Sequence, residues 1–257
     1  MPAPSGLDNC IEIPVNLSPR LACDARQNQL LRALPDAEWN RWRPFLHPVD
    51  MDAGEVLCEA GSTPAHVYFP ITAVVSLLQL TRDGASSEIA VVASDGMVGI
   101  SLFMGGNATP NRAMVQGAGQ AFRLPALAVR SEVQRGGPVL DMLLRYTQAM
   151  IAQVAQTAAC NRHHSIDQQV CRRLLIGLDR SASNELMMTQ EGVAGLLGVR
   201  REGVTAAALK LQEAGVIRYS RGRISVLDRE GLERRACECY GATKKFHDRL
   251  LPTALAA

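Results

Sequence analysis

The feature that most constrains the fold is a change in hydrophobic period near residue 138. Between Glu55 and about Leu124, short apolar runs rich in β-branched residues alternate with glycine-containing turns such as "RDG", "SDG" and "GGN". From Val139 to Asn161 the chain then reads "VLDMLLRYTQAMIAQVAQTAACN", without a glycine or a proline. Brief strands separated by turns predict a sandwich or barrel, whereas a long uninterrupted run predicts a helix. The sequence therefore predicts an α+β chain whose β-rich part precedes its helical part.

Two shorter segments near or within the β-rich part also carry local signals. "LLRALPDAEWNRWRPFLHPVDMDAG", from Leu30 to Gly54, predicts one or two short helices that end at prolines. "TRDGASSEIAVV" predicts a hairpin with Asp83 and Gly84 at its turn.

The long run after Pro138 has the pattern of a coiled-coil seam. Proline suits the first turn of a helix, and about 22 residues at 1.5 Å each span roughly 33 Å, which is more than the β part needs. Apolar or small residues recur at steps of four and three. These are Leu140, Leu144, Thr147, Ile151, Val154 and Ala158. We interpret them as a homodimer interface; the alternative is a helix buried against its own barrel.

The last third of the chain has the pattern of a winged helix-turn-helix. Ser165 caps one expected helix, and Thr189 caps a short second one, "QEGVAGLL", which Gly198 ends. A further helix is expected from about Arg200 to Ala214, with Gly215 as its stop. Two short helices joined by a glycine-containing turn place the second helix in a DNA major groove. "VIRYSRGRISVL" then predicts a hairpin, the wing, with Arg221 and Gly222 at its tip.

Net positive charge is confined to this last third. From Ser181 onward 12 Lys and Arg stand against 9 Asp and Glu, a net charge of +3, while the other 180 residues carry 15 against 16, a net charge of −1. Between Arg200 and Arg223 there are six basic residues and two acidic ones. Cations at a helix start oppose the helix dipole unless an anion joins them. The pattern therefore favours an anionic partner, and double-stranded DNA fits the motif.

Each expected DNA contact follows from side-chain chemistry. Arg201 suits a bidentate contact with guanine, and Glu202 can accept a hydrogen bond from cytosine. Arg221 and Arg223 suit phosphates, which position a protein without reading sequence. The full predicted set is Thr189, Gln190, Arg200, Arg201, Glu202, Thr205, Ser220, Arg221 and Arg223. Two alternatives remain: a solvated charged face, and a winged helix that contacts only proteins.

A β-rich part, a long helix and a winged helix, in that order, resemble the Crp/Fnr family of bacterial transcription regulators. "MTQEGVAGLLGVRREGVTAAALKLQEAGVIRYSRGRISV" resembles the DNA-binding domain of that family, and "VRREGV" its recognition-helix signature. The resemblance covers about residues 30–235. It implies a jelly-roll-like β-roll of the cyclic-nucleotide-binding type, a homodimer, a palindromic DNA site and RNA polymerase as a further partner. The arginine and glutamate readers of the family fall on Arg201 and Glu202, whereas a third arginine common in the family is Ala206 here.

The expected organisation has five parts. They are a flexible arm (residues 1–29), a sensor domain (30–137), a dimerisation helix (138–164), a winged helix-turn-helix (165–235) and a C-terminal tail (236–257).

The sensor departs from the cyclic-AMP-binding members of the family. Their phosphate cassette places a glutamate directly after a glycine and an Arg-Ser pair further on. Here Ile100 and Ser101 follow Gly99, and Arg112 precedes an alanine. Cyclic AMP is therefore not expected, but Gly99, Ile100, Ser101 and Arg112 could hold another small anionic effector. The alternative is an arginine on a solvated strand and no effector.

The cysteines predict no disulfide framework and no metal site. Seven cysteines at scattered spacings favour free thiols and a cytoplasmic protein. Only Cys10 and Cys23 lie early, which does not support an iron–sulfur cluster. Cys237 and Cys239 form a C-x-C, with His163 and His164 elsewhere. We favour a helical tail with two incidental thiols over a metal or redox role.

Other classes of protein fit the sequence less well. A metal-dependent oxygenase in a small barrel needs clustered ligands, and the β-rich part has one histidine, His66. No catalytic motif of a hydrolase or nucleotidase occurs. A nucleotide-binding module without DNA binding would not explain the basic stretch. No secretory signal and no membrane span are expected.

Overall fold

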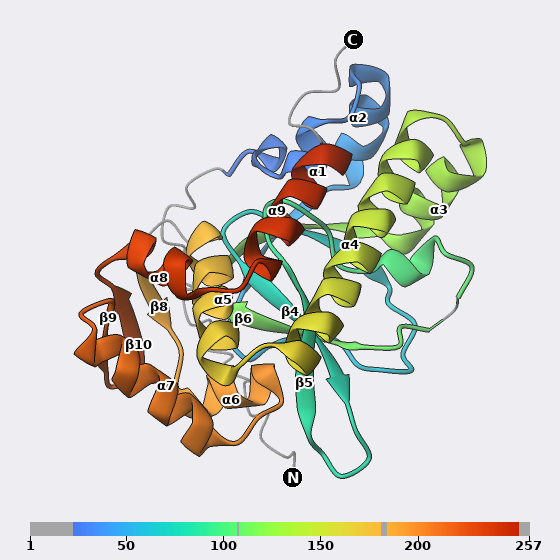
Figure 1. Cartoon of the computed structure of the whole chain (residues 1–257). Coiled ribbons are helices and arrows are strands. Elements are labelled where there is room, and N and C mark those ends of the chain that lie inside the picture. The colour runs from blue at the N-terminus through green and yellow to red at the C-terminus, as the bar shows by residue number, and fades with distance from the viewer. Residues whose placement is uncertain (1–22, 107, 181–183, 252–257) are drawn as a thin grey trace, which may run out of the picture.

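The computed structural model describes residues 23–106, 108–180 and 184–251. A β-rich domain, a long helix and a small helical domain follow one another along the chain (Figure 1). This order confirms the predicted α+β fold class with a winged helix at its C-terminal side.

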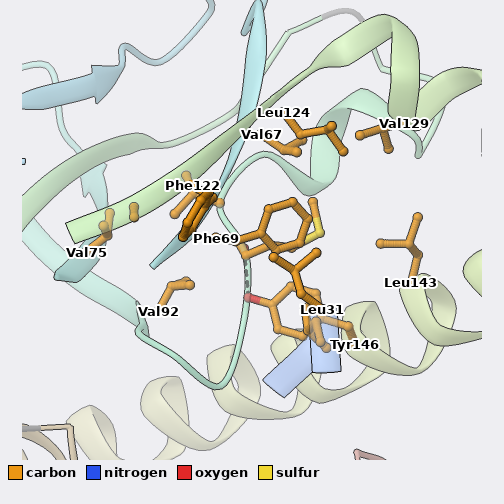
Figure 2. Packing of buried hydrophobic residues seen from close by; sticks show 14 of the residues in the cluster. Leu31, Val67, Phe69, Val75, Val92, Phe122, Leu124, Val129, Leu143 and Tyr146 are labelled. Carbon is orange, nitrogen blue, oxygen red and sulfur yellow. Dashed lines mark hydrogen bonds between the residues drawn. The ribbon is translucent and has the colours of Figure 1, made fainter. Parts of the chain in front are cut away.

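The β-rich domain contains two antiparallel sheets. One has the strand order β1-β7-β3 and the other β2-β6-β4-β5. Their strands are β1 (His47–Met51), β2 (Val56–Cys58), β3 (His66–Pro70), β4 (Val74–Leu80), β5 (Ser86–Val92), β6 (Arg112–Gly117) and β7 (Gly119–Pro125). Side chains from both sheets share one core: Phe69 and Phe122 from the first pack with Val75 and Val92 from the second (Figure 2). The predicted turn at Asp83 and Gly84 joins β4 to β5, with Gly84 at a φ of 86°.

Two segments of the β-rich part differ from the prediction. Helices α1 (Gln29–Arg32) and α2 (Asp36–Trp42) form as expected, but His47–Met51 is strand β1 rather than the end of a helix. This strand lies at a sheet edge, where Pro48 can be tolerated, and it pairs with β7 about 70 residues away. Helix α3 (Ala126–Arg135) has no counterpart in the sequence prediction.

The N-terminal boundary of the sensor domain also needs correction. Residues 1–22 of the expected arm lie outside the described residues. The part from Cys23 onward packs on the domain, because Asn28 is fully buried and its Nδ2 donates to the carbonyls of Pro70 (3.0 Å) and Gly96 (2.8 Å). Its Oδ1 caps α1 by accepting from the backbone of Leu30.

The long helix α4 (Pro138–His163) has 26 residues and begins at the predicted proline. Its inner face packs on the sensor domain through Leu143 and Tyr146 (Figure 2). The Tyr146 hydroxyl donates to the Met97 carbonyl at 2.8 Å. A Cβ at Gly96 would lie 2.8 Å from the Tyr146 ring, so only glycine allows this close approach.

The winged-helix domain has its own core. It comprises α5 (Ile166–Asp179), β8 (Glu185–Met187), α6 (Gln190–Leu197), α7 (Arg201–Glu213), β9 (Ile217–Ser220), β10 (Arg223–Val226) and α8 (Arg229–Arg235). Ser165 caps α5 with a full capping box, as the sequence predicted at that position. The inner face of α7 is buried, with Val204, Ala208 and Leu211 in the core of this domain.

The C-terminal tail is helical, as expected, but it is not a free tail. Helix α9 (Cys239–Leu250) leaves the winged helix and packs back along α4 (Figure 1). The chain therefore returns from the DNA-binding domain to the helix that precedes it.

Candidate nucleic-acid interface

The start of α7 presents two exposed arginines. Gly198 ends α6 in a left-handed conformation (φ 67°), and Arg200 becomes the N-cap of α7 without a side-chain capping bond. Arg200, Arg201 and Glu202 are all exposed. The Nε of Arg201 lies 4.0 Å from Glu191 Oε2, the outer limit of an ion pair, and both side chains are solvated. The uncapped amides and the helix dipole therefore favour an anion at this position.

Three other residues that were predicted to contact DNA make hydrogen bonds within the domain, in and around α6 and α7. Thr189 Oγ1 accepts from the backbone of Gly192 at 2.9 Å and so caps α6. Thr205 Oγ1, on α7, lies 2.7 Å from Gln190 Oε1, on α6. The backbone N–H of Gln190 donates to the Tyr219 hydroxyl at 3.0 Å, which ties α6 to β9. Thr189, Gln190 and Thr205 thus fix the orientation of α7.

The wing ends in the predicted two-residue turn. Arg221 (φ 47°) and Gly222 (φ 78°) both have left-handed backbones, as a type I′ turn requires. Ser220 and Arg221 are exposed, and no carboxylate among the described residues pairs with Arg221. Arg223 differs, because its Nη1 lies 3.0 Å from Glu185 Oε2. A phosphate at Arg223 would share that guanidinium with Glu185.

The outer face of α4 is apolar, but its stripe differs from the predicted one. Leu144 is 54% exposed and Ile151 61%, and Ala158 is also exposed. Leu140 and Val154 are half-buried, and Thr147 is only 7% exposed. Thr147 is turned into its own chain, since its hydroxyl donates to the Leu143 carbonyl, so it has little surface to offer a partner. The exposed stripe consists of Leu144, Gln148, Ile151, Ala155, Ala158 and Arg162.

Three of the four predicted effector residues, Gly99, Ile100 and Ser101, lie at the start of a short 3₁₀ helix. Gly99 (φ 111°) has a left-handed backbone and is the N-cap of the helix η3 (Ile100–Leu102). Ser101 Oγ is buried and has no hydrogen-bond partner among the described residues. Arg112, at the start of β6, pairs through Nε with Glu59 Oε2 at 2.8 Å. An incoming anion would therefore have to displace a carboxylate.

Comparison with known proteins decides the family. The model of the Crp-like helix-turn-helix domain matches residues 168–235, and that of the cyclic nucleotide-binding domain matches residues 48–135. The chain belongs to the Crp/Fnr family of transcriptional regulators. It is a DNA-binding transcriptional regulator with a cyclic-nucleotide-binding-like sensor domain.

Individual relatives agree with this assignment. The CRP-like cAMP-activated global transcriptional regulator of Mycobacterium tuberculosis is 25% identical over 199 residues, which cover 74% of this chain and 88% of that protein. A Crp/Fnr-family structure from Eubacterium rectale aligns with a TM-score of 0.64 at 19% identity, over 80% of this chain and 96% of that one. The structure of FixK2 from Bradyrhizobium japonicum aligns with a TM-score of 0.63 at 15% identity, over 75% of this chain and 98% of that one. No helix among the described residues of this Crp/Fnr regulator is long and apolar enough to cross a membrane.

Buried ion pairs join the sensor of this regulator to its DNA-binding domain. Glu88 on β5 and Arg173 on α5 are both almost fully buried, with Arg173 Nε 2.9 Å from Glu88 Oε1. Ser76 donates to the other oxygen of Glu88. No sequence pattern indicated this pair, because its members are 85 residues apart.

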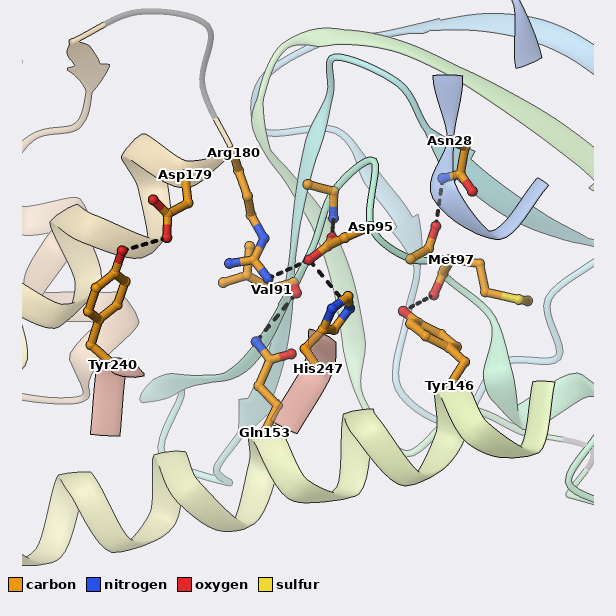
Figure 3. A network of polar contacts seen from close by, with 12 residues as sticks. Asn28, Val91, Asp95, Met97, Tyr146, Gln153, Asp179, Arg180, Tyr240 and His247 are labelled. Atoms are coloured by element: carbon orange, nitrogen blue, oxygen red, sulfur yellow. Dashed lines mark hydrogen bonds and ion pairs between the residues drawn. The ribbon is translucent and has the colours of Figure 1, made fainter. Parts of the chain in front are cut away.

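A second contact gathers three segments. Asp95, after β5, lies 3.0 Å from Arg180 Nη2, beyond α5, and 3.6 Å from His247 Nε2 on α9 (Figure 3). Burial raises the pKa of Asp95, but Arg180 and His247 outweigh burial and leave that pKa below its ordinary value. The carboxylate is therefore held ionised at the junction of sensor, DNA-binding domain and C-terminal helix.

The structure also gathers four potential metal ligands. The donor atoms of Cys160, His164, Cys237 and Cys239 all lie within 4.8 Å of one another. The sequence pattern named Cys237, Cys239 and His164 as candidates for a metal or redox role, which was not favoured, and it did not include Cys160. The expected absence of a metal site is untested.

Proposed function

We propose that this regulator works as a cytoplasmic homodimer that reads a two-fold symmetric DNA site through α7. The observation that carries the proposal is the pair of exposed cationic features on one small domain: the uncapped start of α7 and the tip of the wing. In a winged helix these features meet the major groove and the adjoining backbone. RNA polymerase is the further partner that the family resemblance implies.

The roles of individual residues follow from their exposure. Arg201 and Glu202 project from the first turn of α7 and suit guanine and cytosine edges. Arg200 and Arg221 suit phosphates, because neither has a carboxylate partner among the described residues. Ala206 stands where the family resemblance implies an arginine, so the half-site sequence of the family is not carried over to this chain.

Dimerisation is assigned to the exposed stripe on α4. Leu144, Ile151, Ala155 and Ala158 repeat at heptad spacing and leave an apolar face in water. A second copy of α4 would cover this face and set the distance between the two recognition helices.

We assign no cyclic AMP to the sensor in the manner of the cAMP-activated relative. The positions after Gly99 hold no carboxylate for a ribose hydroxyl, and Arg112 is paired with Glu59. Isothermal titration with cyclic AMP is expected to show no saturable heat, and saturable one-to-one binding would contradict this assignment.

The DNA-binding proposal is tested by selecting random duplexes with the purified, ligand-free protein and re-measuring the enriched sequences across salt concentrations. A two-fold symmetric consensus with half-sites one helical turn apart is the expected result. Salt-sensitive binding with no enriched sequence would contradict ligand-independent sequence reading.

One substitution tests the assignment of the reader. Arg201→Ala should cost about 1–3 kcal/mol on the selected site and relax one base position in each half-site. Arg234→Ala is the matched control, because Arg234 lies on α8 of the same domain and its side chain is 64% exposed, like that of Arg201. If Arg201→Ala retains full discrimination between site and non-site DNA, α7 does not read the base through Arg201.

A further inference from the structure

Three buried cysteines and a histidine meet where the long helix ends. Cys160 lies in the last turn of α4, and His164 is the C-cap that follows. Cys237 lies between α8 and α9, and Cys239 is the first residue of α9. The cysteines are 0%, 4% and 1% exposed and form a cluster separate from the cores of both domains. Apolar packing with either core therefore does not explain their position.

The distances within this Cys₃His cluster match tetrahedral coordination of one ion. Cys160 Sγ lies 3.6 Å from Cys237 Sγ, and Cys239 Sγ lies 3.4 Å from His164 Nδ1. With zinc–sulfur bonds of about 2.3 Å, zinc–nitrogen bonds of about 2.05 Å and tetrahedral angles, the expected separations are about 3.8 Å and about 3.6 Å. All four donors fall within 4.8 Å, so one ion can reach each of them with little movement.

The two obvious alternatives explain less of the cluster. A disulfide between Cys160 and Cys237 would need the sulfurs at about 2.05 Å, and it would leave Cys239 and His164 without a role. A two-iron cluster divides its four ligands between two irons. Four donors gathered this closely suit a single ion better.

Side chains around the four potential ligands make the contacts that are usual around a metal site. His164 Nε2 lies 3.2 Å from Glu238 Oε1, so the ring nitrogen opposite the proposed ligand atom faces a carboxylate, as is usual for metal-bound histidines. Gln156 Nε2 donates to Cys239 Sγ at 2.9 Å, so a polar side chain outside the four ligands holds this sulfur in place.

A buried cation beside the cluster calls for negative charge. Arg172 on α5 is only 7% exposed and interacts electrostatically with Cys160. Its Nη2 donates to the Thr157 hydroxyl at 3.1 Å, but no carboxylate among the described residues pairs with it. Three thiolates and one divalent ion carry a net charge of minus one, which would balance this guanidinium. Buried charges are ordinarily paired.

We propose that Cys160, His164, Cys237 and Cys239 bind one zinc ion in a closed structural site. Four protein ligands leave no open position for a substrate, and a tetrahedral set of three thiolates and one imidazole is a common structural zinc site. The ligands come from either side of the DNA-binding domain in the sequence, since 77 residues separate Cys160 from Cys237. The ion fastens the end of α4 to the segment that leaves α8, and so fixes how the winged helix is held relative to the dimerisation helix.

The site is tested on the full chain, purified without a histidine tag under reducing conditions. Elemental analysis should give about one zinc per protomer. After removal of zinc, Co²⁺ should restore one equivalent with the absorption of tetrahedral cobalt and a thiolate-to-cobalt charge-transfer band. Cys237→Ser and Cys239→Ser should reduce the zinc content to a small fraction of one equivalent, whereas Cys171→Ser, at a buried cysteine outside the cluster, should leave it unchanged.

Several results would overturn the proposal. One is a zinc content far below one equivalent together with the spectrum of octahedral cobalt. Another is a loss of zinc in the Cys171→Ser control as large as that in Cys237→Ser and Cys239→Ser. A third is a metal-free Cys160–Cys237 disulfide in protein purified under reducing conditions. If the serine variants do not fold, the zinc content and cobalt spectrum of the unmodified chain decide the question. The metal readouts are independent of DNA: a zinc-loaded protein that selects no DNA sequence contradicts the proposed function and leaves the site standing.

Discussion

At the scale of single residues, the DNA-facing surface combines charge with backbone strain. Among the described residues, Arg221 is the one residue other than glycine with a positive φ. A left-handed backbone costs most residues about 1–2 kcal/mol, so a long cationic side chain at this position is not chosen for local stability. The phosphate contact proposed for Arg221 would explain an exposed arginine at the tip of a rigid turn.

Arg221→Asn separates these two effects. Asparagine tolerates the left-handed region, so the free energy of unfolding should stay within about 0.5 kcal/mol or rise. Affinity should fall alike for all DNA sequences, and the slope of log affinity against log salt should decrease by about one. Fluorescence anisotropy across a salt series measures both. Arg221→Lys is the control that retains the charge, and an unchanged salt slope in Arg221→Asn would exclude a phosphate contact.

At the scale of elements, the sensor and DNA-binding domains meet through buried charge. β5 and α5 are joined by Glu88 and Arg173, both nearly inaccessible to water. Removing one member of such a pair leaves an uncompensated buried charge, whereas removing both replaces it by apolar packing. The pair thus favours the one arrangement of the two domains in which both buried charges are paired.

Glu88→Gln should therefore lower the free energy of unfolding by about 3–5 kcal/mol. The double variant Glu88→Leu/Arg173→Met should recover most of that loss, because neither buried charge remains. Urea denaturation followed by circular dichroism measures the effect. If the double variant is as unstable as the single one, the pair does not act as a coupled unit.

The Asp95 junction predicts a pH dependence. The pKa of Asp95 is lowered in the folded protein, so its contribution to stability is fully present above the ordinary pKa of an aspartate and is lost as the pH falls through the lowered value. Asp95→Asn should thus destabilise the protein near neutral pH, and the difference from the unmodified protein should shrink at strongly acidic pH. Urea denaturation at a series of pH values tests this. A difference that does not depend on pH would show that the ionised carboxylate contributes nothing.

At the scale of the whole molecule, the sequence predicted what local signals determine. Ser165 and Thr189 start helices, Gly198 ends one, and the turn at Arg221 and Gly222 shapes the wing, all within a few residues. Local signals of this kind were sufficient to predict the winged helix, the long helix that begins at Pro138 and the hairpin at Gly84.

Contacts between distant parts of the chain could not be predicted in this way. Pairing with β7 turns His47–Met51 into a strand, although its own residues fit the end of a helix. The partner of Arg173 and the meeting of Cys160 with Cys237 depend on how domains and the returning helix α9 pack. The orientation of α4 likewise decides that Thr147 faces inward while Ala155 faces outward.

In the proposed mode of binding, two copies joined through α4 read one symmetric DNA site. The most direct measurement compares binding of the ligand-free regulator to a duplex with both selected half-sites and to a duplex with one, with the stoichiometry from analytical ultracentrifugation. Two protomers on the full site and much weaker binding to the half-site are the expected result. Ile151→Asp should abolish the higher affinity for the full site over the half-site. Leu127→Asp, at an exposed leucine on α3, should not. One protomer per duplex with equal affinity for both duplexes would show that the regulator does not read the site as a dimer.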